Sequence, residues 1–211
     1  MSDLLPYLPA FVAAYGLLLV GGASPGPAVA MLMGLSFGQG RRAALIACLG
    51  IAAGATTNNL LTMAGVGLLL SQAAWAMTTL KLAGAAYLAW LAFGALRKAI
   101  HPPALATAET APRGAVRLLL MGYAMQVTNP KSIVFWLAIA ALSPTAGAPL
   151  WVAALFVGSC FALSFCTHAA WALLLSTAHV RAIYTRSRRW IEGALGVFFA
   201  LFAFRLATDR S

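Results

Sequence analysis

A lysine and a histidine inside long apolar stretches carry the chemistry of this sequence. Lys131 follows Asn129 and Pro130 near the middle of one apolar segment, and His168 lies in another. A charged lysine at the centre of a bilayer costs about 2.5 to 3.5 kcal/mol, so it needs a partner or a hydrated cavity. An unperturbed histidine changes its charge near neutral pH. The sequence therefore predicts that Lys131 lines a transport route and could bind a carboxylate, and it makes His168 a candidate proton carrier.

Both residues also admit a structural interpretation. The Lys131 side chain could extend toward the membrane surface, or it could bind the carbonyls of Gln126 and Val127 that Pro130 leaves without a partner. His168 could be an ordinary packed histidine. The sequence alone does not choose between these interpretations.

Two interruptions of apolar segments indicate where a binding site would form. Residues 8–37 are apolar except for the stretch Gly21-Gly22-Ala23-Ser24-Pro25-Gly26-Pro27, and Thr128-Asn129-Pro130 interrupts a second segment half a chain length later. Proline lacks a backbone donor, so each helix must unwind or kink there, and the exposed carbonyls and helix ends can bind polar groups. Breaks at matching places in two halves are typical of a transporter's binding site. Kinks that serve only helix packing are the alternative.

Polar residues at helical spacing extend the predicted path. Asn58 and Thr62 lie on one face of the second apolar segment, and Ser164 and His168 lie on one face of the fifth. These stripes could line a hydrophilic path, or they could provide only interhelical hydrogen bonds of about 0.6 kcal/mol each. The predicted substrate path, with His168 as the proton-coupling candidate, comprises Pro25, Gly26, Pro27, Asn58, Thr62, Asn129, Pro130, Lys131 and Ser164.

The composition is that of an integral membrane protein. Hydrophobic residues make up 62% of the chain and charged residues only 9%, against roughly 25% charged in a soluble domain. The net charge of +10 does not indicate a nucleic-acid partner, because the basic residues fall almost wholly in short connections between apolar segments. The expected partners are therefore the lipid bilayer and a small molecule.

The apolar segments predict an all-α fold with six transmembrane helices. They cover residues 8–37, 43–70, 79–96, 115–142, 150–176 and 191–208. Alternate connections carry the basic residues, namely Arg41, Arg42, Arg97, Lys98, Arg113, Arg117, Arg181, Arg186, Arg188 and Arg189. The connections at 71–78 and 143–149 carry no charge. The positive-inside rule places the basic connections in the cytoplasm and both termini outside.

Three segments followed by three segments give the two halves opposite orientations. The chain is thus expected to be one polytopic membrane domain built from two inverted repeats, about 5–98 and 115–208, whose first helices are broken at the proline motifs. A basic, proline-containing cytoplasmic linker, about 99–114, joins them. The glycines Gly34, Gly38, Gly50 and Gly54 are spaced four apart in pairs, which predicts close packing of helix backbones.

Other function classes find little support. Cys160, Cys166 and His168 are close in sequence, but at about 100° per residue Cys166 faces away from the other two, so one helix cannot gather a metal site. Hydrolase and nucleotide-binding motifs are absent from the sequence, and no segment has an acidic residue at depth. No enzyme activity, metal or cofactor is expected.

Several short motifs together resemble those of the LysE/RhtB family of amino-acid exporters. In chain order they are Pro25-Gly26-Pro27, Gly40-Arg41-Arg42, Gly50 with Gly54, Lys81-x-x-Gly84-Ala85-Ala86-Tyr87-Leu88, Asn129-Pro130-Lys131 and Arg189-Trp190-Ile191-Glu192-Gly193-Ala194. Each motif is weak by itself, and their order and spacing over nearly the whole chain make the resemblance fairly specific.

The resemblance implies secondary-active efflux of amino acids across the bacterial inner membrane, coupled to protons. Several family members have an acidic residue after the glycine that corresponds to Gly54, where this chain reads Ala55-Thr56-Thr57-Asn58-Asn59. A neutral amino acid or derivative is therefore favoured over a cationic one. A passive channel is the second interpretation, followed by a metal-ion exporter or an intramembrane enzyme. A homo-oligomer is left open.

Overall fold

The computed structural model describes residues 2–24, 26–72, 74–102, 113–142 and 144–208. Pro25 of the predicted path and residues 103–112 of the predicted linker lie outside these ranges. The described residues form a short 3-10 helix, Ser2–Tyr7, and eight α-helices, and they contain no strand. The helices are α1 (Leu8–Ala23), α2 (Pro27–Gly38), α3 (Gly40–Gln72), α4 (Ala74–Ile100), α5 (Ala115–Val127), α6 (Pro130–Ala141), α7 (Leu150–Leu175) and α8 (Ala178–Thr208). The predicted all-α class is confirmed.

Both predicted breaks are present. Helix α1 stops before Ser24 and α2 starts at Pro27, while α5 stops before Thr128 and α6 starts at Pro130. Each second helix therefore has proline at its first position, where the missing N–H would have no partner in any case and the fixed φ suits a helix. Each second helix thus starts at a proline of the motif that interrupts the apolar segment.

Two predicted connections are shorter than expected, because helix occupies much of each. Residues 71–78 were expected to be a loop, yet α3 reaches Gln72 and α4 begins at Ala74. Residues 177–190 were also expected to be a loop, yet α8 begins at Ala178. Neither stretch contains glycine or proline, and arginine and alanine favour helix, so polarity alone does not stop the helix. Gly40 does mark a turn, with φ of 81° between α2 and α3.

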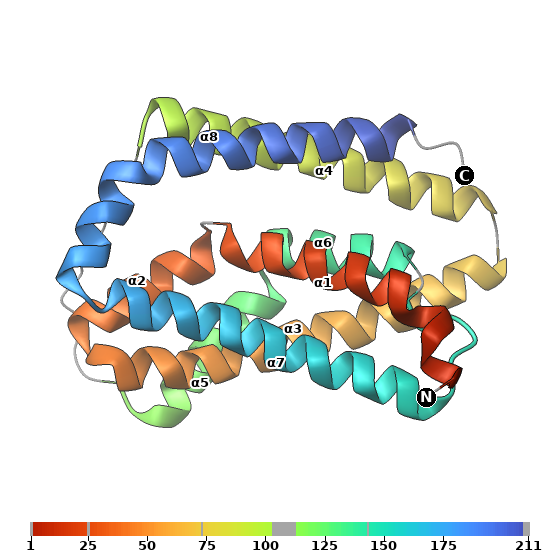
Figure 1. Ribbon diagram of the computed structural model, residues 1–211, viewed down its shortest axis with the longest axis horizontal. Helices are drawn as coiled ribbons and strands as arrows, with labels where there is room; N and C mark the ends of the chain where they lie inside the picture. The colour runs from red at the N-terminus through yellow and green to blue at the C-terminus, as the bar shows by residue number, and fades with distance from the viewer. Residues whose placement is uncertain (1, 25, 73, 103–112, 143, 209–211) are drawn as a thin grey trace.

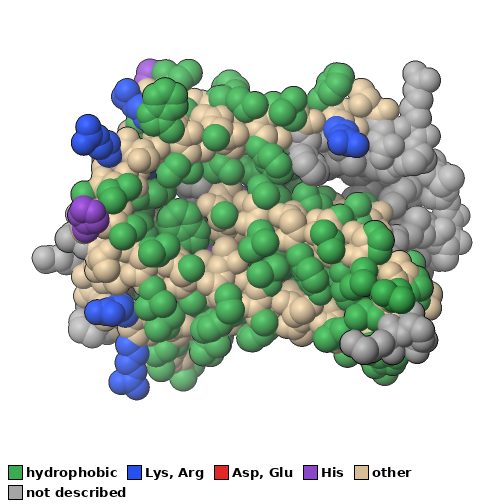
Figure 2. All heavy atoms as spheres, viewed as in Figure 1, with side chains coloured by type: hydrophobic (Ala, Val, Ile, Leu, Met, Phe, Trp, Pro, Cys, Tyr) green, Lys and Arg blue, Asp and Glu red, His purple; other side chains and the backbone are tan. Residues whose placement is uncertain are grey.

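The helices run along a common direction, and their connections gather at two ends (Figure 1). The α2–α3 junction, the end of α4, the start of α5 and the α7–α8 junction lie at one end. Both chain termini and the α3–α4 and α6–α7 junctions lie at the other. Figure 2 shows most of the visible Lys and Arg side chains at the first end and apolar side chains over the middle. We call the first end the basic end.

The surface and length of the helices identify a multi-pass membrane protein. Three helical segments, Leu4–Ala23, Gly40–Gly65 and Leu150–Leu175, are long and apolar enough to cross a membrane. Helices α2, α5 and α6 are shorter apolar helices. Large apolar side chains such as Leu150, Phe204 and Phe93 are well exposed, as expected for side chains that face lipid.

Glycines let α3 and α5 touch backbone to backbone. A Cβ atom on Gly50 would lie 2.0 Å from the carbonyl oxygen of Leu119, and one on Gly122 would lie 2.1 Å from the carbonyl oxygen of Ala47. The predicted packing role is therefore confirmed for Gly50, and also for Gly54, which lies against Tyr123 and Gln126. It is wrong for Gly34, whose Cβ would meet no atom within 4 Å.

Helices α4 and α8 form a separate layer beside the others. They lie along each other over most of their length, with α1 and α6 in the next layer (Figure 1). Leu88 and Ala92 of α4 pack with Phe199 and Ala203 of α8, and Phe135 of α6 joins this cluster. The α4–α8 pair thus meets the broken helices through α6.

The close contact between α3 and α5 predicts that Gly122→Ala destabilises the protein. The added methyl would overlap backbone atoms that cannot rotate away, at a cost of about 1 to 3 kcal/mol. The midpoint of thermal unfolding in detergent should fall by several degrees. The control is Gly158→Ala on the exposed face of α7, where a Cβ meets no atom within 4 Å and alanine favours helix. Equal midpoints for the two variants would contradict the proposed packing.

Candidate functional site

The α1–α2 break is satisfied by side chains rather than left open. Gly21 would normally bond to the backbone N–H of residue 25, which is proline, and its carbonyl instead accepts from the Ser24 hydroxyl at 2.9 Å. The carbonyl of Gly22 accepts from the indole Nε1 of Trp171 on α7 at 3.1 Å. In an apolar environment such partners avoid a cost of several kcal/mol per unsatisfied group.

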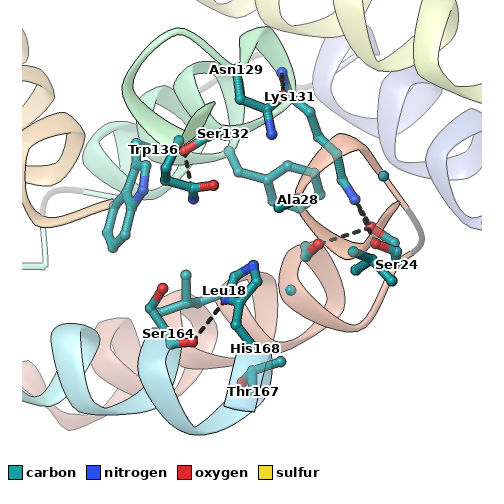
Figure 3. A pocket seen from close by; sticks show the side chains of 16 residues that line it. Leu18, Ser24, Ala28, Asn129, Lys131, Ser132, Trp136, Ser164, Thr167 and His168 are labelled. Atoms are coloured by element: carbon teal, nitrogen blue, oxygen red, sulfur yellow. Dashed lines mark hydrogen bonds between the residues drawn. The ribbon is translucent and has the colours of Figure 1, made fainter. Parts of the chain in front are cut away.

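Lys131 joins the two broken helices. Its Nζ donates to the Ser24 carbonyl at 2.9 Å and also to the Ser24 hydroxyl (Figure 3). The structural alternative that paired Lys131 with the carbonyls of Gln126 and Val127 is therefore wrong, because the ammonium reaches across to the other break. The N-cap Asn129 accepts from the Lys131 backbone N–H at 3.1 Å, which fixes the start of α6.

The side chain of Asn58 donates hydrogen bonds to groups at the α5–α6 break. Its Nδ2 donates to the carbonyl of Gln126 at 3.0 Å, the carbonyl that Pro130 cannot satisfy. The same Nδ2 and the Gln126 Nε2 both donate to the Ser132 hydroxyl, at 3.1 and 3.0 Å. Thr62 donates to the carbonyl of Asn58 at 2.8 Å, within its own helix. Asn58 thus connects α3 to the second break through hydrogen bonds.

A small polar cavity of about 40 Å³ lies between the two breaks and α7. Gly26, Asn129, Lys131 and Ser132 line it from the breaks, and Ser164 and His168 line it from α7 (Figure 3). Trp136 closes one side. Since a cavity of about 10 to 15 Å³ on this scale can hold one water molecule, this cavity has room for only a few of them.

The polar groups on α7 face this cavity in a defined arrangement. The His168 Nδ1 lies 2.8 Å from the carbonyl oxygen of Ser164. A carbonyl can only accept, so Nδ1 carries the hydrogen and Nε2 is the basic nitrogen of the neutral ring. The Ser164 hydroxyl is buried and has no hydrogen-bond partner among the described residues. The side chain of His168 is itself buried.

A second cavity of about 230 Å³ also borders Lys131 and lies against the α4–α8 pair. Gly26, Asn129 and Lys131 line this cavity as well as the first one. Pro27 and Pro130 line the second cavity alone. The N-cap residues Gly26 and Asn129, together with Lys131, therefore form a shared wall, where two helix N-termini and one ammonium group supply positive potential.

A family model for LysE type translocators matches residues 19–210 of this chain. The chain belongs to that family. The predicted LysE/RhtB resemblance is thereby confirmed. No solved structure matches this translocator significantly.

Several relatives of this translocator are named as threonine or homoserine/homoserine lactone efflux proteins. It is 28% identical over 204 residues to the threonine efflux protein of Escherichia coli K12, covering 89% of this chain and 92% of the relative. The threonine efflux protein of Salmonella typhi is 28% identical over 198 residues, with the same coverage. The homoserine/homoserine lactone efflux protein of Salmonella typhimurium is 38% identical over 121 residues, which are 57% of this chain and 56% of the relative.

The structure brings together most of the predicted site residues of the translocator. Those that line one or both cavities are Gly26, Pro27, Asn129, Pro130, Lys131, Ser164 and His168. Asn58 and Thr62 are not among the residues that line these cavities. Among the described residues there is also no group of three or more His, Cys, Asp or Glu side chains that could hold a metal ion.

Sequence reasoning missed Ser24, Gln126 and Ser132, although each is within four residues of a break-forming proline. It also missed a carboxylate. Glu192 of α8 is only 2% exposed and lines the second cavity. Glu192 is only the second residue of the predicted sixth segment, so its position looked peripheral.

Proposed function

We propose that this translocator exports amino acids from the cytoplasm by secondary active transport, with the substrate carboxylate bound at the shared wall. The observation that carries the proposal is the convergence of Lys131 with the N-terminal ends of α2 and α6 on both cavities. A carboxylate that enters an apolar protein interior must exchange its hydration for a cation or several aimed donors. The wall offers both kinds of group.

Lys131 already has partners in this conformation, and this shapes the proposed cycle. Its ammonium bonds to Ser24, a neutral group, and no anion takes part in that contact. A substrate carboxylate would be a stronger acceptor for the same ammonium, because charge-assisted hydrogen bonds are roughly twice as strong as neutral ones. Binding would therefore loosen the contact between the two breaks and allow the halves to move.

A neutral side chain suits the second cavity best. Besides Lys131, the basic residue Lys98 lines this cavity, and Glu192 is the acidic residue there among the described ones. A substrate with an additional positive charge would meet like charges, which are costly at low dielectric. The relatives' names point to threonine, homoserine and homoserine lactone. All three carry a primary amino group, and the lactone has no free carboxylate.

The proposed topology is six membrane crossings in two inverted repeats within one domain, in the bacterial inner membrane. Residues 5–98 and 115–208 would be the repeats, with 99–114 as the linker. Support comes from the two breaks at matching places and from the gathering of basic connections at one end (Figures 1 and 2). The basic end would face the cytoplasm and both termini the outside. The oligomeric state is left open.

Proton coupling through His168 completes the proposal. The Nδ1 of His168 donates a hydrogen bond to the Ser164 carbonyl, so the Nε2 of the same ring remains free to accept a proton beside the first cavity. Protonation would place a second positive charge near Lys131 and would strengthen the attraction for a carboxylate. A passive channel would use neither step, and its flux would ignore a pH gradient.

Cysteine labelling tests the topology. Single cysteines at Arg42, Arg186 and Ala146 are introduced after Cys48, Cys160 and Cys166 have been replaced. An impermeant maleimide added to intact cells should label position 146 and should label positions 42 and 186 only after the membrane is opened. Labelling of all three positions from the same side would contradict the inverted repeat.

Transport by the purified protein tests the role of Lys131. Proteoliposomes with an imposed pH gradient should take up labelled threonine or homoserine, and Lys131→Met should reduce the rate at least tenfold while insertion persists. Lys131→Arg should recover only part of the rate, since the wider guanidinium needs a different set of partners. Ser24→Ala is the control: it removes the hydroxyl contact and keeps the cation, so the rate should fall less than about threefold. A Lys131→Met protein with an unchanged rate would refute the carboxylate site.

His168→Gln tests the coupling. Glutamine retains hydrogen-bonding groups and cannot titrate, so the variant should lose at least tenfold in gradient-driven uptake while exchange between equal substrate pools persists. Ser164→Ala is the matched control, because it keeps the carbonyl that orients the ring. If gradient-driven uptake by His168→Gln equals that of the unaltered protein, His168 is structural and the proton takes another route.

A further inference from the structure

We propose that Glu192 binds the ammonium group of the exported amino acid in the second cavity, opposite Lys131. This inference rests on the proposed function, which pairs the substrate carboxylate with Lys131, and it adds a partner for the substrate ammonium group. It gives the cavity a defined ligand class, a compound with a primary ammonium group and a small neutral side chain.

Glu192 is a buried acid whose environment calls for a positive partner. Its side chain is 2% exposed on α8 and lines the second cavity. Burial of an ionised carboxylate costs several kcal/mol unless cations and hydrogen bonds compensate. The basic groups near enough to act on its charge are Lys98 of α4, Arg188 of α8 and Lys131 of α6. The acid therefore occupies a site where a cation is stabilised, next to a cavity that can admit one.

The second cavity is built like a site for a zwitterion. Lys131 lies on the wall formed by the broken helices, and Glu192 lies on the wall formed by the α4–α8 pair. Leu91, Leu195 and Phe199 supply apolar surface. Opposite charges on opposite walls with apolar surface beside them match an amino acid, whose two charged groups are joined by one carbon. The Tyr87 hydroxyl on the same wall is buried and has no hydrogen-bond partner among the described residues, so it offers a further polar contact.

The volumes decide between the two cavities. The cavity beside His168 holds about 40 Å³, and the cavity beside Glu192 holds about 230 Å³. Only the second therefore has room for an amino acid in this conformation. Lys98 is in the last turn of α4, and α4 ends at the basic end (Figure 1). The larger cavity thus reaches toward the proposed cytoplasmic side, from which an exporter must load.

The ammonium of the substrate takes the place of Lys98, which lines the same cavity and acts on the charge of Glu192. Lys98 is partly exposed, and its long side chain can turn toward water at the basic end. The exchange leaves the charge around Glu192 unchanged, since one ammonium replaces another. Every candidate substrate considered above has the primary amino group that this exchange requires, including the lactone without a free carboxylate.

The test compares ligands that differ only in the amino group. Inhibition of labelled threonine uptake into proteoliposomes is measured for L-threonine and for 2,3-dihydroxybutanoate of the same stereochemistry, in which a hydroxyl replaces the amino group. The unaltered protein should prefer threonine at least tenfold. Glu192→Gln should reduce that preference to less than about threefold, because it should weaken inhibition by L-threonine and leave inhibition by the hydroxy acid unchanged. Arg205→Gln, a charge change at an exposed position of α8, is the control and should keep the full preference.

The outcomes separate this inference from the proposed function. If the unaltered protein transports neither threonine nor homoserine, the proposed function fails. If it transports them and Glu192→Gln keeps the tenfold preference, only the role of Glu192 fails. Should Glu192→Gln not fold, Glu192→Asp replaces it. The shorter carboxylate should weaken inhibition by L-threonine at least fivefold and leave inhibition by the hydroxy acid unchanged. Equal weakening of both ligands would overturn the inference.

Discussion

The need to pair every backbone carbonyl in an apolar environment governs this structure. The breaks before α2 and α6 leave carbonyls in the preceding turns without their usual helical partners, and lipid cannot replace them. Side chains from other parts of the chain do so: Trp171 reaches Gly22, Lys131 reaches Ser24, and Asn58 reaches Gln126. Each of these contacts joins elements that are distant in sequence. The breaks thus interrupt two helices and are also places where side chains connect distant parts of the chain.

The elements that local chemistry determines could be predicted from the sequence. The two breaks follow from proline, the long helices from apolar length, and the common basic end from the spacing of arginines and lysines. The helix ends near Gln72 and Ala178 could not be predicted in the same way. Membrane crossing depends on hydrophobicity, whereas helix continuation depends on backbone propensity, and a polar stretch without glycine or proline satisfies the second requirement only.

The site was predictable to the extent that its residues adjoin the breaks. Lys131 and Asn129 were predicted for that reason, and His168 was predicted because a titratable group is rare in an apolar helix; all three line the first cavity. Glu192 belongs to α8, and only the tertiary arrangement, in which α4 and α8 form a layer beside α6, brings it to the cavity. Asn58 was predicted from its helical spacing, and in this structure its side chain bonds to the backbone carbonyl of Gln126 and lines neither cavity.

The shared wall between the two cavities has a consequence for stoichiometry. Lys131 has one ammonium group, and that group borders both cavities. If it is the carboxylate site, two carboxylates cannot be held by it at once, because the second would meet a cation already neutralised and would face the negative charge of the first. Occupancy would then be limited to one substrate molecule per turnover, and flux would saturate along a simple hyperbola without cooperativity within a single chain.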